Sequence, residues 1–373
     1  MPEQPSGASG ADVSETLPRI GVLPSGPRDL ISDVPGVTVG HATLDHGDVQ
    51  TGVTVVMPGE GDTFLRKVPA ATAVINGFGK SAGLIQVQEL GVLETPIALT
   101  NTFSVGAVAS AQIRAAVSRH PEIGREWSTV NPLVFECNDG YLNDIQAMAV
   151  SAEHYAKACQ EATAEFAQGS VGAGRGMSSF SFKGGIGSAS RIATLPNDQR
   201  HTLGALVLAN YGRLETLTVA GQPLGRRIAA SKPQKANERA EPEKGSIIMI
   251  IATDAPLDTR QLERLAKRSA AGLARTGSVY GHGSGDIALA FSSAWRVPHL
   301  ASEPMPAVRM LHESMLDPLF DACAEAVEQA IVHALWRATT VTGRAGHRRE
   351  AIANAVPNWR DLLALQHSSE RSQ

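Results

Sequence analysis

The chain is poor in cysteine, in aromatic residues and in basic charge, and it has no long apolar run. Its three cysteines, Cys137, Cys159 and Cys323, are widely spaced and form no CxxC pair, which argues against a disulfide framework or a zinc finger. A net charge of −4 offers no basic field for nucleic acid. No apolar run approaches the roughly 18 residues that a membrane-spanning helix needs. We therefore expect no nucleic-acid, membrane or metal partner.

The composition is that of a folded domain. Hydrophobic residues make up 43% of the 373 residues and charged residues 19%, whereas aromatic residues reach only 5%. Glycine occurs 36 times, so tight loops and packing of small side chains are expected. The N-terminal stretch shows no basic segment followed by an apolar one, so no signal peptide is predicted. Together with free cysteines, this favours a cytoplasmic location.

The residue pattern predicts one globular α/β domain preceded by a flexible arm. Residues 1–27 are rich in Ser, Gly and Pro, as is typical of a loose terminus. From residue 28 onward, strand and helix patterns alternate without an internal repeat, which indicates an α/β fold. The pattern is interrupted at 231–245, where seven charged residues and two prolines predict an exposed linker.

A Gly-Ser pair stands between this linker and an apolar strand. Gly245 and Ser246 are followed by five apolar residues, 247–251, which is typical of a fully buried strand. A hydroxyl can attack the carbonyl group just before it where the backbone is distorted and the preceding residue is small, and glycine meets both conditions. Cleavage would leave Ser246 with a free α-amine of pKa about 7.7–8, suited to act as base for its own hydroxyl. Taken alone, the pair is a weak signal, because most Gly-Ser pairs before an apolar strand are ordinary loop ends.

A second polar pair follows one helix later, in YGHGSGDIALAF at 280–291. The intervening helix is predicted to begin at Asp258, which can cap it. Ser284 and Asp286 are two residues apart at the start of a strand, so their side chains share a face. If the helix is a crossover between parallel strands, both strands begin at the same sheet edge and the pair lies beside Ser246. The alternative interpretation is a simple polar turn.

These features, with a series of further motifs, resemble the L-aminopeptidase/D-amidase/D-esterase and β-peptidyl aminopeptidase family. Its members are self-processing N-terminal-serine hydrolases related in fold to ornithine acetyltransferase. The similarity covers nearly the whole chain, which makes it specific. The matching blocks, in chain order, are SDVPGVTVGHAT, TGVTVV, NGFGKSAGL, ALTNTFSVG, ECNDGYLND, GAGRGM, FKGGIGSASR, LVLANYG, GSIIMIIATDAPL and GSGDIALAF.

The resemblance implies an αββα sandwich of the aminopeptidase/ornithine acetyltransferase type, resembling N-terminal nucleophile hydrolases. It implies cleavage between Gly245 and Ser246 into an α fragment, 28–245 after the arm, and a β fragment, 246–373. The two fragments would remain together as one globular domain. The resemblance also implies a homo-oligomer, a tetramer of such αβ pairs, and a reaction that needs no metal or organic cofactor.

Site residues follow from the resemblance by matching position. Ser246 matches the nucleophile and new N-terminus, and Ser284 with Asp286 completes the catalytic group. Some members carry glutamate where this chain has Asp286, whose side chain is one methylene shorter. Asn210 matches an amide that donates to the oxyanion hole. Glu136 matches the carboxylate that receives the ammonium group of the substrate, which implies substrates with a free amine.

The second oxyanion donor stays open. Characterised relatives place a tyrosine hydroxyl there, shortly after the glutamate. In this chain the position two beyond Glu136 is Asn138, and Tyr141 follows later. Asn138 and Tyr141 are therefore both candidates for substrate binding.

The sequence leaves three alternative functions open. The sequence GKSAG at 79–83 fits the G-x-S-x-G pattern between a strand and a helix, as in an α/β-hydrolase with Ser81 as nucleophile, although no clear Asp-then-His pair follows. The GFGKS stretch imitates the end of a phosphate-binding loop but has Val74 at the position of its first glycine, which leaves a non-enzymatic anion-binding protein as the second alternative. The third is an acyltransferase of the same fold, although those relatives use threonine where this chain has Ser246.

Weighed together, these patterns predict a self-cleaving serine aminopeptidase. It would release N-terminal residues from short peptides, amides or esters that carry a free amine. The sequence does not distinguish among L-residues, D-alanyl derivatives and β-amino acids, because that preference depends on the shape of the pocket.

Overall fold

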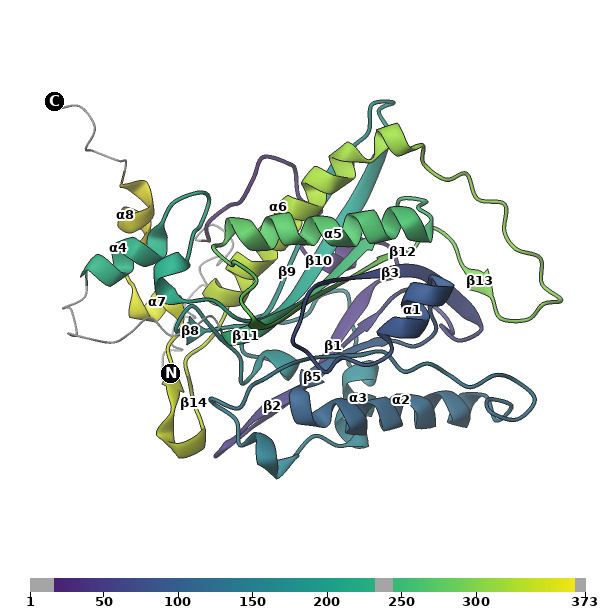
Figure 1. Cartoon of the computed structure of the whole chain (residues 1–373), viewed down its shortest axis with the longest axis horizontal. Helices are drawn as coiled ribbons and strands as arrows, with labels where there is room; N and C mark the ends of the chain where they lie inside the picture. The colour runs from purple at the N-terminus through teal and green to yellow at the C-terminus, as the bar shows by residue number, and fades with distance from the viewer. Residues whose placement is uncertain (1–16, 232–243, 366–373) are drawn as a thin grey trace, which may run out of the picture.

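The computed structural model describes residues 17–231 and 244–365. In that part of the chain, two β-sheets face each other and helices cover both outer faces, which is the predicted αββα arrangement (Figure 1). Most of the predicted linker, residues 232–243, lies outside the described residues, as do residues 1–16 of the predicted arm. The expectations of an exposed linker and a flexible terminus therefore stay predictions for those stretches.

Strands from both halves of the sequence form the larger sheet. The sheet runs in the order β13 (Val297–Pro298), β3 (Arg66–Gly77), β12 (Gly283–Ser292), β11 (Lys244–Thr253), β10 (Arg200–Asn210) and β9 (Gly185–Thr194), with β4 (Val92–Leu93) paired to β3. β11 is parallel to β12 and antiparallel to β10, and β3 is antiparallel to β12.

The smaller sheet and the helices complete the four layers. The sheet runs in the order β1 (Thr38–His46), β2 (Val49–Met57), β5 (Ile97–Asn101) and β6 (Val134–Cys137). Long helices α5 (Thr259–Arg275) and α6 (Asp317–Trp336) cover the larger sheet, while α2 (Val105–Arg119) and α3 (Ala152–Gln160) cover the smaller one. Figure 1 shows these two helix pairs on opposite sides of the sheets.

β11 shows why its sequence is apolar at every position. Alternate side chains of a strand point to opposite faces of the sheet. Ile247, Met249 and Ile251 pack in the cluster under α5 and α6, whereas Ile248 and Ile250 pack between the two sheets. Because both faces of the larger sheet are covered, a strand at its centre needs apolar side chains on both of its faces.

The connection between β11 and β12 is the predicted crossover. α5 begins at Thr259, and the Asp258 carboxylate accepts a hydrogen bond from the backbone N–H of Gln261 at 2.7 Å. The Gln261 side chain in turn accepts from the Asp258 backbone N–H at 3.1 Å, which completes a capping box. The helix returns the chain to its starting edge, so β11 and β12 begin side by side.

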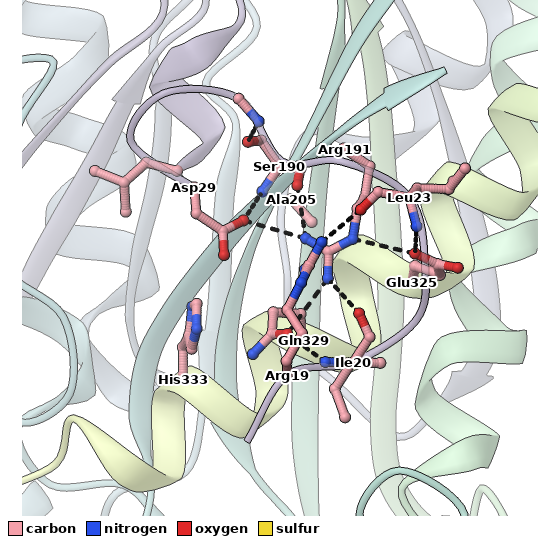
Figure 2. A network of polar contacts seen from close by, with 12 residues as sticks. Arg19, Ile20, Leu23, Asp29, Ser190, Arg191, Ala205, Glu325, Gln329 and His333 are labelled. Carbon is pink, nitrogen blue, oxygen red and sulfur yellow. Dashed lines mark hydrogen bonds and ion pairs between the residues drawn. The ribbon is translucent and has the colours of Figure 1, made fainter. Parts of the chain in front are cut away.

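Residues 17–27, expected within the flexible arm, are bound to the body of the domain. Figure 2 shows the contacts: the buried Arg191 guanidinium donates to the Ile20 carbonyl at 2.8 Å and forms ion pairs with Asp29 and Glu325, each at 3.2 Å. The backbone N–H of Ile20 donates to the Gln329 side chain at 2.7 Å. Composition alone missed this attachment, because its partners lie on β9 and α6, far along the chain.

The remaining elements are short. They are the helices α1 (Leu84–Leu90), α4 (Leu224–Ser231), α7 (Ile352–Ala355) and α8 (Trp359–Ala364), the hairpin strands β7 (Ser178–Ser179), β8 (Phe182–Lys183), β14 (Val341–Thr342) and β15 (Arg348–Arg349), and the single 3-10 turns at Ile31–Asp33, Thr102–Ser104, Ile145–Ala147, Gly172–Gly174, Leu214–Thr216, Glu313–Met315 and Arg344–Gly346. Within residues 17–231 and 244–365, every helix is too short or too polar to cross a lipid bilayer.

Candidate active site

Three strands of the larger sheet bring the predicted catalytic residues to one edge. β11 and β12 begin at this edge and β10 ends there. In the ladder, Ser246 stands opposite Asn210 on one side and opposite Gly285 on the other, while Gly245 stands opposite Ser284. The predicted neighbourhood of Ser246 and the Ser284 pair is therefore present in the structure.

The Ser246 hydroxyl is held by a backbone group that sequence reasoning missed. Its Oγ accepts a hydrogen bond from the Gly285 N–H at 3.1 Å, and the side chain is almost fully buried. A Cβ at position 285 would lie 3.0 Å from Ser246 Oγ and 2.9 Å from the Phe78 carbonyl oxygen. Glycine at 285 therefore lets the 77–80 turn and the Ser246 hydroxyl approach the same backbone. The Gly-Ser-Gly-Asp pattern at 283–286 was the sequence signal that could have pointed to a close backbone approach at Gly285.

Gly245 has a conformation and a location that only glycine fits. Its φ of +140° lies in a region that residues with a Cβ rarely adopt. A Cβ there would lie 2.0 Å from the Asn210 carbonyl oxygen. Both conditions for a small, distorted residue before Ser246 are thus met.

Ser284 and Asp286 form a direct, buried pair. The Ser284 hydroxyl donates to the Asp286 carboxylate at 2.5 Å, and neither residue is accessible to solvent. The shorter acid therefore reaches the serine without a bridging group. The Asn76 amide donates to the Gly281 carbonyl at 3.0 Å and also bonds the Ser284 carbonyl, which holds the loop before β12 in place.

Asn210 is oriented from both sides of its carboxamide. Its Oδ1 accepts from the Ser178 backbone N–H at 2.8 Å, and its Nδ2 donates to the Asn138 carbonyl at 2.9 Å. A primary amide carries two N–H groups, so the second can donate to a substrate oxyanion. The geometry fits the predicted donor.

Glu136 reaches the same region from the other sheet. Its side chain on β6 is buried, and its oxygens accept hydrogen bonds from the Lys80 backbone N–H at 2.7 Å and from the Thr102 hydroxyl. A Cβ at Gly79 would lie 3.5 Å from Glu136 Oε1 and 3.8 Å from the Gly285 Cα. Glu136 is therefore separated from the Ser246 edge only by the 77–80 turn. Sequence reasoning missed Thr102, although the ALTNTFSVG block contains it.

Cys137, beside Glu136, is kept as a neutral thiol. Burial raises its pKa well above the ordinary value, and the carboxylates of Glu136 and Asp286 raise it further. Its Sγ donates to the Leu208 carbonyl at 3.5 Å. Because the thiolate is the nucleophilic form, burial makes the Cys137 thiol a poor nucleophile.

The two candidates for the second oxyanion donor differ in position. The exposed Asn138 accepts a hydrogen bond from the Gly140 N–H at 2.9 Å, as in a local turn. The Tyr141 hydroxyl accepts from Arg349 at 3.0 Å, and its ring stacks on His347 with 4.6 Å between centroids. Tyr141 is thus attached to the β14–β15 hairpin, whereas Asn138 lies in the loop whose carbonyl accepts from Asn210.

Two of the alternative interpretations are wrong. Ser81 Oγ is buried without a hydrogen-bond partner among the described residues, and β3 before it is antiparallel to its neighbour, so a nucleophile elbow is not formed. In the turn resembling a phosphate loop, the N–H groups of Phe78, Gly79 and Lys80 donate to Ser284, Gly77 and Glu136. These N–H groups are therefore already hydrogen-bonded within the protein.

Across the described ranges, no three His, Cys, Asp or Glu side chains gather as a metal site would require.

Comparison with known proteins finds similar sequences and similar folds. The model of peptidase family S58 matches residues 29–349. The beta-peptidyl aminopeptidase BapA of Sphingosinicella xenopeptidilytica is 38% identical over 336 residues, 85% of this chain and 83% of that protein. The PH0078 protein of Pyrococcus horikoshii OT3 superimposes with a TM-score of 0.86 at 46% identity, covering 95% of this chain and 98% of that one. An L-aminopeptidase D-Ala-esterase/amidase from Ochrobactrum anthropi, described as a prototype of the serine aminopeptidases and a variant of the Ntn hydrolase fold, gives 0.82 at 33% identity, covering 93% and 98%.

Proposed function

Because this chain belongs to peptidase family S58 and is a serine aminopeptidase with an Ntn-type fold, we propose that it cleaves itself before Ser246 and then uses Ser246 on peptide substrates. Family membership also removes the acyltransferase of the same fold from consideration. The observation that carries the proposal is the position of Ser246 in the ladder, between Asn210 and Gly285.

Self-cleavage would proceed in two steps, an acyl shift from nitrogen to oxygen and a hydrolysis. Ser246 Oγ bonds to the Gly245 carbonyl carbon, the bond from that carbon to the Ser246 nitrogen breaks, and the nitrogen takes the hydroxyl proton. Water then hydrolyses the resulting ester to a Gly245 carboxylate and a Ser246 with free hydroxyl and amine. The positive φ of Gly245 supports this path, because it holds the carbonyl in a conformation that ordinary strands do not adopt.

Turnover would reuse the same atoms. The Ser246 hydroxyl attacks the acyl carbon of the substrate while its own amine accepts the proton. The second N–H of Asn210 stabilises the oxyanion, and the amine returns the proton to the leaving group. Water then releases the acyl group. Ser284, fixed by Asp286 opposite Gly245, orients the new N-terminus.

For the substrate, we propose short peptides, amides and esters with a free N-terminal amine. The BapA relative is named for β-peptides, which supports including N-terminal β-amino acids. The test is release of p-nitroaniline from matched L-, D- and β-aminoacyl p-nitroanilides, with the mature protein weighed by mass spectrometry. Turnover by a protein found as fragments 1–245 and 246–373 supports the proposal, and turnover by one unbroken chain contradicts self-cleavage. We also propose that the fragment pairs assemble as a tetramer, which light scattering can measure.

Gly245→Ala should leave most of the protein uncleaved. The new Cβ would meet the Asn210 carbonyl oxygen at 2.0 Å, so the backbone at the cleaved bond must shift. Overpacking of this kind costs about 1–3 kcal/mol of stability. A time course on a denaturing gel measures cleavage. Gly47→Ala is the matched control, because Gly47 also has a positive φ but a Cβ there meets nothing within 4 Å. Cleavage of Gly245→Ala at the wild-type rate would contradict the prediction.

Glu136→Gln should weaken binding of substrates through their ammonium group. Hydrogen bonds to charged groups contribute about 1.5–3 kcal/mol, so kcat/KM for an aminoacyl ester should fall about tenfold to a hundredfold. The corresponding ester without an amino group should be hydrolysed at the wild-type rate. Glu94→Gln is the control, since it removes a buried carboxylate that pairs with Lys67 instead. An equal loss on both esters would exclude the ammonium role for Glu136.

A further inference from the structure

A buried lysine lies behind the Asn210 side of the site. Lys183 is inaccessible to solvent, and its Nζ donates to three backbone carbonyls, those of Gly174, Met177 and Gly184, each at 2.8 Å. An ammonium group has three donors, so all of them are used. Burial lowers the pKa of Lys183 well below its ordinary value and the charge of Arg175 lowers it further, whereas Asp139 and the three carbonyl acceptors favour the protonated form. We therefore ask which neighbouring group the buried lysine holds in place.

One peptide unit connects Lys183 to Asn210. The unit between Met177 and Ser178 accepts a hydrogen bond from Lys183 at its carbonyl and donates its N–H to Asn210 Oδ1 at 2.8 Å. A buried cation on the carbonyl side polarises the peptide and strengthens the bond that its N–H donates. That bond fixes the orientation of the Asn210 carboxamide, with Oδ1 toward Ser178. The amide nitrogen is thereby directed away from Ser178.

The other end of the carboxamide is held by a loop that also carries a buried carboxyl group. Asn210 Nδ2 donates to the Asn138 carbonyl, and the next residue, Asp139, is inaccessible to solvent. Asp139 accepts from the Asn143 amide at 3.0 Å. A Cβ at Gly176 would lie 2.8 Å from the Asp139 Cβ, so the two loops touch. Burial raises the pKa of Asp139 to about 7, and the charge of Lys183 acts in the opposite direction.

We propose that Lys183 is a positioning residue, which holds the Met177–Ser178 peptide so that the Asn210 carboxamide presents an N–H to the oxyanion. This inference rests on the proposed function, in which Asn210 is the oxyanion donor. Asp139 steadies the loop on the opposite side. A positioning role differs from a structural one because removing Lys183 lowers kcat only when Asn210 is present.

A double-mutant cycle separates the two roles. Lys183→Met, Asn210→Ala and the double variant are assayed on one aminoacyl p-nitroanilide, with kcat counted per cleaved chain. Lys183→Met should lower kcat by about ten- to a hundredfold with little change in KM, because a displaced catalytic group loses rate rather than binding. The double variant should be no slower than Asn210→Ala alone, since Lys183 has nothing further to position.

Arg191 provides the matched control. It is another fully buried basic side chain, on β9 of the larger sheet, and its partners are Ile20, Asp29 and residues of α6 (Figure 2). Arg191→Met should lower the melting temperature, and any loss of kcat should be additive with Asn210→Ala. If Lys183→Met does not fold, Asp139→Asn is entered into the same cycle, because it keeps an oxygen for Asn143.

The outcomes are distinguishable. A loss for Lys183→Met that multiplies fully with that of Asn210→Ala, as for Arg191→Met, would overturn the positioning role. If Asn210→Ala alone keeps wild-type kcat, the oxyanion assignment fails instead. If the wild-type protein does not turn over the anilide, the proposed function itself fails.

Discussion

Ser246→Ala is expected to give a single uncleaved chain with no aminopeptidase activity. Alanine keeps the small side chain but removes the oxygen that attacks both the Gly245 carbonyl and the substrate. Removing the nucleophile of a serine hydrolase costs up to about 10⁶-fold in kcat. Here the loss is compounded, because without cleavage the α-amine at position 246 remains part of a peptide bond and cannot accept a proton.

Two measurements check this expectation. A denaturing gel should show one band for Ser246→Ala where the wild-type protein shows two, and N-terminal sequencing of the smaller wild-type fragment should begin at Ser246. The anilide assay should show no turnover above background. Ser81→Ala is the control, because Ser81 lies in the rival motif without a hydrogen-bond partner among the described residues, and it should cleave and react normally. A cleaved, active Ser246→Ala would refute the mechanism.

Asn210→Ala is expected to lower kcat by about 10²–10³-fold, which is the usual effect of removing one oxyanion donor. KM should change little, because the oxyanion forms only in the transition state. The variant also loses the bonds to Ser178 and Asn138, which removes a stabilising contact from each of the two loops. Steady-state kinetics on correctly cleaved protein, with the melting temperature measured in parallel, separates the contributions.

Gln112→Ala is the matched control for this loss. The buried Gln112 amide also bonds backbone on both sides, donating to the Pro96 carbonyl and accepting from the Leu133 N–H, each at 2.8 Å. It lies on α2, away from the Ser246 edge. Its removal should lower stability and leave kcat per folded chain unchanged. Equal kcat losses in the two variants would show that Asn210 matters for folding and not for the oxyanion.

Local sequence patterns were sufficient where the structure is decided locally. The apolar run after Ser246 predicted a strand buried on both faces, and Asp258 predicted the start of the crossover helix. From these two elements and the two-residue period of a strand, the Ser284–Asp286 pair could be placed beside Ser246 before any coordinates. Helix caps and strand periods depend on neighbouring residues, so they can be read from a short window.

The residue patterns by themselves thus predicted an α/β fold and the edge on which Ser246 stands, while the resemblance to a known family supplied the four layers and the role of Ser246 as nucleophile. Only the tertiary structure decided what surrounds that edge. Glu136 arrives from the other sheet, Lys183 acts behind Asn210 through a third segment, and the G-x-S-x-G pattern at Ser81 forms no elbow. These contacts join segments that are far apart in the chain, and they depend on how two sheets stack. No local preference of the residues involved encodes that distance or that orientation.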